Sequence, residues 1–172
     1  IPGKGDEEEY AEMMLAFDHL GFTAEQQRMV KHVVAAVMHL GNLDFVPGKD
    51  DECSKVDPAA LRHGSGTGAD TLALCARLLK LDAGDLETCM CNFRRTIRGE
   101  EITSPLSPKK ASDMRDSLCK ALYGNMFVWL VDRVNDRLYH GTSEAHIGLL
   151  DIFGFESFKF NSFEQLCINL AN

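Results

Sequence analysis

The chain has 172 residues, enough for one ordinary domain, and 45% of them are apolar and 26% charged, which is typical of a globular protein. Its net charge of −8 argues against a broad basic surface, so we expect no nucleic-acid partner. The sequence contains neither an apolar run of about eighteen residues nor a secretory signal, so we expect no transmembrane segment. Because Ile1 stands first and a helical pattern runs to the last residue, we expect an internal piece of a larger polypeptide.

Six cysteines are spread along the chain. Cys89 and Cys91 are one residue too close for the usual Cys-x-x-Cys half of a zinc site, and no second half follows. We therefore expect free, buried thiols in a reducing compartment.

The first elements in the chain are predicted to be helices. After a Gly- and acid-rich segment over residues 1–7, apolar residues over 10–20 fall on one helical face that ends at Gly21. Residues 23–26, Thr-Ala-Glu-Gln, form a capping box that opens a second helix, which ends at Gly41.

The middle of the chain alternates between polar segments and helices. Residues 46–57 are polar with Pro and Gly, which predicts a surface loop. The Gly-rich residues 64–68 lack both a preceding strand and a Lys-Ser/Thr at the Walker spacing, so we interpret them as a connection and not as a phosphate loop. Residues 69–81 and 83–93 then follow helical patterns.

A basic-to-acidic segment precedes the longest predicted helix. Residues 94–101 run from basic to acidic, and residues 102–106 have an extended pattern. Ser107 and Pro108 predict an N-cap and a first-turn proline, and the helical pattern then continues to Tyr139. Two apolar rows wind around this helix, so we expect its middle, including Trp129, to be buried on most sides.

The last patterned stretch runs from residue 147 to residue 172. Apolar residues over 147–153 predict a strand buried on both faces, with Asp151 near its C-terminal end. Ligands bind at the carboxyl ends of strands in open α/β sheets, and Gly154 completes an Asp-x-x-Gly spacing that a nucleotide site can use. Taken alone, this spacing fits a simple strand-to-turn connection equally well. Residues 162–165, Ser-Phe-Glu-Gln, predict the start of a helix.

The whole string is far more specific than Asp-x-x-Gly. Residues 151–156, DIFGFE, followed by residues 161–169, NSFEQLCIN, closely resemble switch II and the start of the relay helix of the myosin motor. Residues 39–45, HLGNLDF, match a myosin phrase, and the resemblance extends through nearly all of the chain. The chain is thus identified as a member of the myosin family, and its pattern over residues 127–132 looks more like unconventional myosins than muscle myosin.

This resemblance implies a fold and a division of the chain. The fold is expected to be mainly α with one or a few β-strands, a fragment of the P-loop NTPase-type motor that is α/β when complete. Residues 1–146 would belong to the helical upper 50-kDa subdomain, residues 147–161 to the switch II strand and loop, and residues 162–172 to the start of the relay helix.

The resemblance also implies roles in nucleotide chemistry. Asp151 matches the Asp that reaches Mg²⁺ through a coordinating water, and Gly154 matches the Gly whose N–H bonds the γ-phosphate of ATP. Glu156 matches the Glu that pairs with a switch I Arg and helps position the lytic water. The implied catalytic residues are thus Glu156 and Gly154, the implied cofactor-binding residues are Asp151, Gly154 and Phe155, and the implied cofactors are ATP and Mg²⁺.

A further implied site is an actin-facing loop over residues 94–106, with Arg98, Glu100 and Glu101 as contact residues. The family has a Thr, Glu, Asp or Ser sixteen residues before a motif that corresponds here to residues 116–120, which points to Glu100, with Glu101 as the near alternative. A carboxylate fixed there would make actin engagement independent of phosphorylation. Without the resemblance, the same charges would read as a solvated hairpin.

The sequence lacks a Walker phosphate loop and a switch I segment. We therefore expect this chain to hydrolyse ATP only together with the rest of the motor chain, in the cytoplasm at the actin cytoskeleton. Light chains or calmodulin would bind only through a lever arm, which these residues do not include. The alternatives are a truncated, non-catalytic helical module with weak or no actin binding and, disfavoured by the missing phosphate loop, an unrelated GTPase-like protein.

Overall fold

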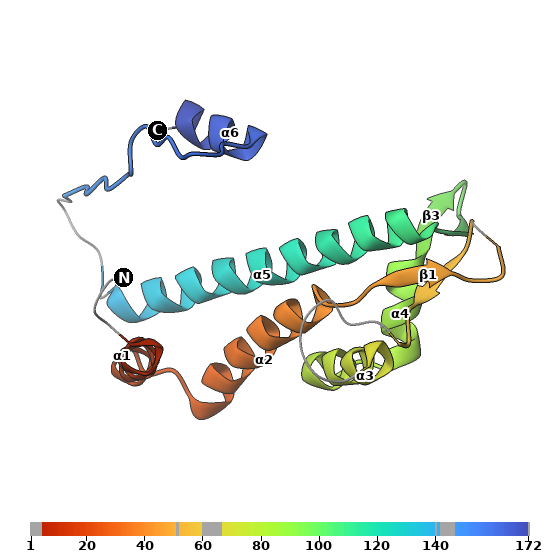
Figure 1. Ribbon diagram of the computed structural model, residues 1–172. Helices are drawn as coiled ribbons and strands as arrows, with labels where there is room; N and C mark the ends of the chain where they lie inside the picture. The colour runs from red at the N-terminus through yellow and green to blue at the C-terminus, as the bar shows by residue number, and fades with distance from the viewer. Residues whose placement is uncertain (1–4, 51, 60–66, 140, 142–146, 172) are drawn as a thin grey trace. The chain divides into compact units, whose positions relative to one another are not determined.

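The structure is a computed structural model that describes residues 5–50, 52–59, 67–139, 141 and 147–171. The chain divides into two compact units, residues 1–139 and residues 140–172, and each is described here by itself. The fold is mostly helical with a few short strands, as the sequence predicts (Figure 1). Among the described residues, no helix has the length and apolar character needed to cross a bilayer.

Two helices begin the first unit, and the second has a capping box. Helix α1 spans Asp6–His19, and Gly21, with φ of 68°, turns the chain toward helix α2, Ala24–Leu40. The predicted capping box is present, because the Thr23 side chain accepts from the Gln26 N–H at 3.2 Å and the Gln26 side chain accepts from the Thr23 N–H at 2.9 Å. Two of the backbone donors at this helix start are thereby satisfied.

A small antiparallel hairpin follows α2. Strand β1, Phe45–Pro47, pairs with strand β2, Ser54–Val56, in the register Phe45 to Val56. The prediction of a surface loop over residues 46–57 is therefore wrong at its two ends. Val56 is buried in the core and its N–H donates to the Glu87 carboxylate at 2.7 Å, so tertiary contacts outweigh the polar composition that suggested a loop.

Helices α3, Gly68–Leu79, and α4, Ala83–Cys91, cover the same core. Thr67 and Asp82 cap their starts with side-chain oxygens. The predicted bounds are correct to within about two residues, as expected for capped helices.

The basic-to-acidic segment forms a second hairpin. Strand β3, Asn92–Ile97, pairs antiparallel with strand β4, Glu100–Pro105. Arg98 and Gly99 link them with φ of 53° and 86°, the two positive values that a tight type I′ turn requires. Nearly all residues of the hairpin are exposed, so it extends from the helices that carry it (Figure 1).

Helix α5, Pro108–Leu138, is the long helix that the sequence predicts, although the Ser107 side chain makes no capping bond. The expectation that its middle is buried on most sides is wrong for the described residues. Tyr123, Phe127 and Val128 are 51%, 52% and 59% exposed, because α2, α4 and the β1–β2 hairpin meet only one side of the helix. Trp129 lies on the packed side, with its ring in an edge contact with Phe22 at 6.1 Å.

The core of the first unit lies among α2, α3, α4 and β2. Its members include side chains with no exposed surface, namely Leu40, Leu43, Cys75 and Met90. Arg115 of α5 is also buried, and its guanidinium donates to the Leu43 carbonyl and to the Asp116 carboxylate at 2.7 Å. This arginine therefore joins the HLGNLDF segment to the long helix.

The second unit contains helix α6, Phe163–Ala171, at the predicted start. The strand predicted over residues 147–153 is not formed, and this part of the prediction is wrong for the chain as described. A strand needs a hydrogen-bonded neighbour, and the described strands β1–β4 are paired only with one another. The apolar residues from Ile147 to Phe153 are accordingly exposed.

Candidate functional site

The segment over residues 151–156 is an irregular loop that precedes α6. Asp151 and Phe155 are exposed, whereas Gly154 and Glu156 are half-buried. Gly154 has φ of 73°, and a Cβ placed on it would meet nothing within 4 Å. Glycine is therefore favoured here by the backbone conformation and not by lack of space.

The backbone of Glu156 is held by a side chain from α6. The Asn169 carboxamide oxygen accepts from the Glu156 N–H at 2.9 Å, and the Asn169 carboxamide nitrogen donates to the Glu156 carbonyl at 2.7 Å. Gln165, one turn earlier on α6, donates to the same Asn169 oxygen at 3.3 Å. The loop is thus fixed to the helix at the residue predicted to be catalytic.

A similar bond pair forms the turn between the loop and α6. The Asn161 carboxamide accepts from the Phe158 N–H at 2.9 Å and donates to the Phe158 carbonyl at 2.7 Å. Asparagine side chains commonly stabilise turns in this way. This turn sets the direction in which α6 begins.

The structure brings Asp151, Gly154, Phe155 and Glu156 together in one loop of six residues, as their closeness in sequence requires. A carboxylate oxygen suits Mg²⁺, either directly or through water, so Asp151 is chemically fit for that role. Among the described residues, no group of three or more His, Cys, Asp or Glu could hold a metal ion. Asp151 would therefore be one ligand in a set completed by phosphate oxygens, water or other residues.

The β3–β4 hairpin places the other predicted residues at an exposed tip. Arg98 is at the turn, and Glu100 and Glu101 begin β4. The register separates the two acids, because Glu100 is opposite Ile97 and Glu101 is opposite Thr96. Side chains alternate across a strand, so Glu100 shares a face with the exposed apolar Ile97 and Ile102, whereas Glu101 shares the opposite face with Thr96.

The cysteines do not form a metal centre within the described chain. All six are free, and Cys75 and Cys91 are buried whereas Cys89 and Cys167 are exposed, so the expectation of uniformly buried thiols is only partly correct. Burial raises the pKa of the Cys75 thiol to about 12 and also raises the pKa of Cys91. A buried thiol with a raised pKa is a poor nucleophile, so Cys75 serves packing.

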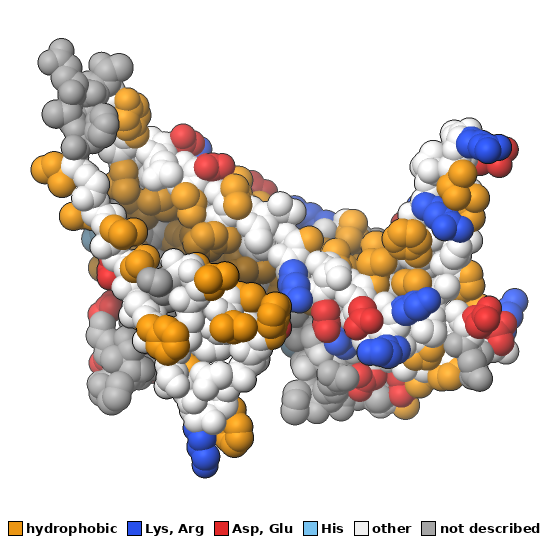
Figure 2. Space-filling view, turned by 90° about the horizontal axis from the view of Figure 1, so that it is seen from above, with side chains coloured by type: hydrophobic (Ala, Val, Ile, Leu, Met, Phe, Trp, Pro, Cys, Tyr) orange, Lys and Arg blue, Asp and Glu red, His pale blue; other side chains and the backbone are white. Residues whose placement is uncertain are grey.

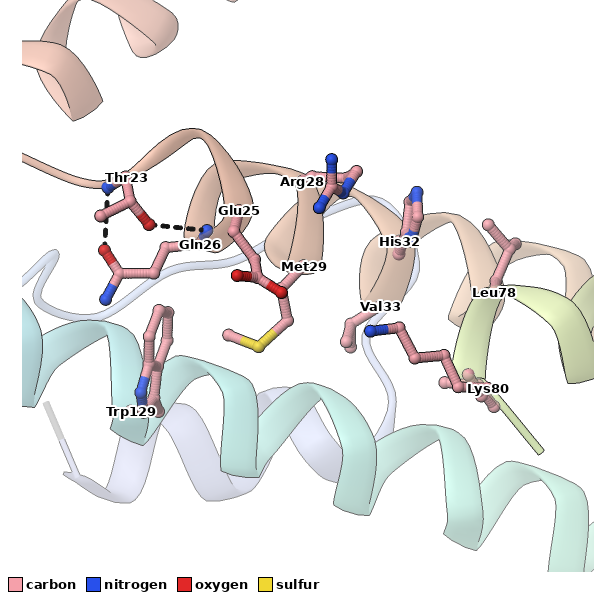
Figure 3. Close-up of a pocket in the computed structure, with 11 residues that line it drawn as sticks. Thr23, Glu25, Gln26, Arg28, Met29, His32, Val33, Leu78, Lys80 and Trp129 are labelled. Atoms are coloured by element: carbon pink, nitrogen blue, oxygen red, sulfur yellow. Dashed lines mark hydrogen bonds between the residues drawn. The ribbon is translucent and has the colours of Figure 1, made fainter.

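A cavity of 570 Å³ lies in the first unit between α2, the end of α3 and α5. Figure 3 shows Met29, Val33 and Trp129 directed into the space between α2 and α5, beside the Thr23–Gln26 capping bonds. None of the residues predicted to act on nucleotide or actin lines it. We therefore assign the candidate site to the loop over residues 151–156 and not to this cavity.

Sequence reasoning missed Asn169 and Arg115. Both act by hydrogen bonding to the backbone of distant residues, namely Glu156 and Leu43. Such partners depend on tertiary structure and leave no periodic signal. The sequence offered one hint for Arg115, namely that it lies four residues before Cys119 at the start of an otherwise apolar helical row.

Comparisons with known proteins agree with the resemblance seen in the sequence. A family model described as Myosin head (motor domain) matches residues 1–172. The chain is 40% identical over 173 residues to Myosin-17 of Arabidopsis thaliana, covering 100% of this chain and 11% of the relative.

Relatives from other kingdoms show similar values. The chain is 40% identical over 173 residues to Myosin-I heavy chain of Dictyostelium discoideum, covering 100% of this chain and 7% of the relative. It is 39% identical over 162 residues to Myosin-IIIa of Homo sapiens, covering 91% of this chain and 10% of the relative. The chain therefore spans about a tenth of the length of the curated relatives it matches.

Proposed function

Because this chain belongs to the myosin head family, we propose that it supplies the γ-phosphate sensor and an actin-facing loop to an actin-based, ATP-hydrolysing motor. The observation that carries the proposal is the DIFGFE loop, in which a left-handed glycine lies between two carboxylates, Asp151 and Glu156. Phosphoryl transfer to water depends mainly on positioning and on charge stabilisation, and these residue types can supply both.

Each residue has a distinct role in the proposed step. Asp151 would hold Mg²⁺ through a bound water, and the N–H of Gly154 would donate to the γ-phosphate, which the absence of a Cβ would allow to approach closely. Glu156 would orient the attacking water, and Phe155, which is exposed in this chain, would pack between these groups in the complete motor. Bound Mg²⁺·ATP supplies the reacting phosphate and the cation that neutralises its charge.

In the proposed arrangement, residues 1–146 form a helical part of the upper 50-kDa subdomain, residues 147–161 form switch II, and residues 162–172 begin the relay helix. The exposed apolar side chains from Ile147 to Phe153 support this division, because a strand of this composition needs neighbours on both sides. The proposed location is the cytoplasm, at the actin cytoskeleton, and the proposed partners are actin and the rest of the motor chain.

The β3–β4 hairpin is the proposed actin contact. Its tip combines Arg98 with Glu100 and Glu101, and its exposed apolar residues include Phe93 and Ile97. A mixed tip of this kind fits a protein surface with both charged and apolar contacts. In the complete motor polypeptide, Arg98→Glu is expected to lower the affinity for actin in co-sedimentation and to make that affinity less dependent on salt concentration. An unchanged affinity would contradict the actin role.

The experiment that tests the nucleotide proposal compares two measurements. The 172-residue chain alone should show no calorimetric binding of Mg²⁺·ATP in the micromolar range, because it has no phosphate loop. In the complete motor polypeptide, Glu156→Gln should slow hydrolysis by about a hundredfold or more, as expected when a group that orients the reacting water is lost. Micromolar binding by the chain alone, or full activity of Glu156→Gln, would overturn the proposal.

A second candidate function is a non-catalytic helical module with weak or no actin binding. The observation that favours it is that the first unit, which carries the hairpin, has its own core of fully buried side chains. Co-sedimentation of the 172-residue chain with actin filaments tests it. Saturable binding abolished by Arg98→Glu would support the module, and background-level pelleting would leave the hairpin to act only in the complete motor.

A further inference from the structure

The described residues of the second unit are nearly all exposed, with four exceptions. Gly154 and Glu156 of the loop and Gln165 and Asn169 of α6 are half-buried. These are also the residues around the two hydrogen bonds between the Asn169 carboxamide and the Glu156 backbone. The local structure of this unit is therefore centred on the contact between the candidate catalytic loop and the helix.

The orientation of the Asn169 carboxamide follows from its partners. A backbone N–H can only donate and a carbonyl can only accept, so the side-chain oxygen must face the Glu156 N–H and the nitrogen must face its carbonyl. Gln165 reinforces this orientation, because its side-chain nitrogen donates to the same oxygen at 3.3 Å. The two α6 residues are four apart, so they lie on one face of the helix.

The two bonds reach the peptide units on both sides of the Glu156 Cα. The N–H belongs to the peptide that joins Phe155 to Glu156, and the carbonyl belongs to the peptide that joins Glu156 to Ser157. Fixing both planes fixes the direction of the Cα–Cβ bond between them. The carboxylate of Glu156 can then sample only the directions that its own side-chain rotamers allow.

We propose that Asn169, oriented by Gln165, is a positioning residue that sets the direction of the Glu156 side chain. This inference rests on the proposed function of Glu156 in orienting the attacking water. Both bonds of the Asn169 carboxamide to this loop described above go to the Glu156 backbone, so the proposed role concerns the hydrolytic step that Glu156 serves.

Hydrogen exchange of the complete motor polypeptide tests the contact itself. Asn161 provides a matched control, because it makes the same pair of bonds to Phe158. Asn169→Leu should speed exchange at the Glu156 amide and leave the Phe158 amide unchanged, and Asn161→Leu should show the reverse. Equal protection of the Glu156 amide in the parent and in Asn169→Leu would overturn the inference.

ATP turnover of the same variants tests the consequence. We expect Asn169→Leu to lower kcat about tenfold or more while the affinity for Mg²⁺·ATP stays within about threefold, because small misplacements of a reacting group are costly. Asn169→Asp should behave similarly, since it keeps the acceptor but replaces the donor that faces the Glu156 carbonyl. Asn161→Leu, which changes the nearby turn, should have a smaller effect on kcat than either.

The outcomes separate this inference from the function on which it rests. If Glu156→Gln abolishes hydrolysis while Asn169→Leu leaves kcat unchanged, the proposed function stands and the positioning role is overturned. If Glu156→Gln itself retains full activity, the proposed function is overturned, and the positioning role that rests on it is overturned with it. A parallel fall in kcat and in nucleotide affinity for Asn169→Leu would indicate general disruption of the loop and would also overturn the inference.

Discussion

Among the described residues, the first unit contains buried apolar side chains, whereas the second unit contains none. In the first unit, Leu40 and Leu43 have no exposed surface, whereas in the second Leu149 and Phe153 are 95% and 91% exposed. Figure 2 shows apolar side chains exposed at the surface of the chain. The first unit brings its own partners for these side chains, whereas the second consists of a loop and one short helix.

This difference shows that an apolar pattern identifies side chains that are favourable to bury, but does not show that the chain supplies the elements that bury them. A helix satisfies its backbone internally, so α6 forms even with its apolar side chains exposed. A strand satisfies its backbone only through a neighbour, so residues 147–153 remain irregular. Large exposed apolar surfaces usually mark an interface, which agrees with a role for the second unit inside a larger assembly.

The largest expected effect comes from removing a buried leucine. Leu40→Ala should lower the free energy of unfolding of the 172-residue chain by about 2–5 kcal/mol, because it leaves a cavity in the core. Leu149→Ala should change it by about 0.5 kcal/mol or less. Denaturant unfolding followed by the fluorescence of Trp129, the one tryptophan, measures both, and equal effects would break the comparison.

A smaller effect is expected from the buried arginine. Arg115→Met should cost about 1–3 kcal/mol, because it leaves the Leu43 carbonyl without its charged donor. The matched control is Arg133→Met on the same helix, whose ion pair with Asp136 is partly exposed and should be worth about 0.5 kcal/mol or less. The same unfolding measurement applies, and a larger loss for Arg133→Met would contradict the structure.

A smaller effect on stability is expected from the residues that cap the helices. Thr23→Ala removes a side-chain acceptor from the capping box of α2 and should cost about 1 kcal/mol. Ser107→Ala at the start of α5 should cost less, because the Ser107 side chain makes no capping bond in the described chain. Thermal unfolding of both variants beside the parent measures the difference, and equal costs would show that the Thr23 bonds do not stabilise α2.

The smallest effect near neutral pH concerns the thiols. Because burial raises the pKa of Cys75 to about 12, the thiol keeps its proton in the folded state when the unfolded chain has lost it. Its contribution to stability is therefore fully present below about pH 9 and is lost as the pH rises toward 12. At pH 8, a thiol reagent should modify exposed Cys167 quickly and Cys75 only when the chain unfolds. In the Cys75→Ala variant, the free energy of unfolding should fall less steeply above pH 9 than it does in the parent.

Local signals predicted much of the first unit. Capping residues such as Thr23 and the helical periodicity before Gly41 depend on neighbours in sequence, and the helices appear where those signals placed them. The β1–β2 hairpin and the exposed side of α5 depend on which elements meet in space, and the sequence pattern did not contain that information. For the candidate site, the motif residues were visible in the sequence, but the bonds from Asn169 were not.

The central claim, that the loop over residues 151–156 senses the γ-phosphate, is tested most directly at Gly154. In the complete motor polypeptide, Gly154→Ala should slow single-turnover ATP hydrolysis by about a hundredfold or more, because φ of 73° disfavours a Cβ and the N–H loses its direction. Gly124→Ala in α5, outside the candidate site, where a Cβ would also meet nothing within 4 Å and φ is not positive, should hydrolyse ATP at the parental rate. Parental hydrolysis by Gly154→Ala would contradict the claim.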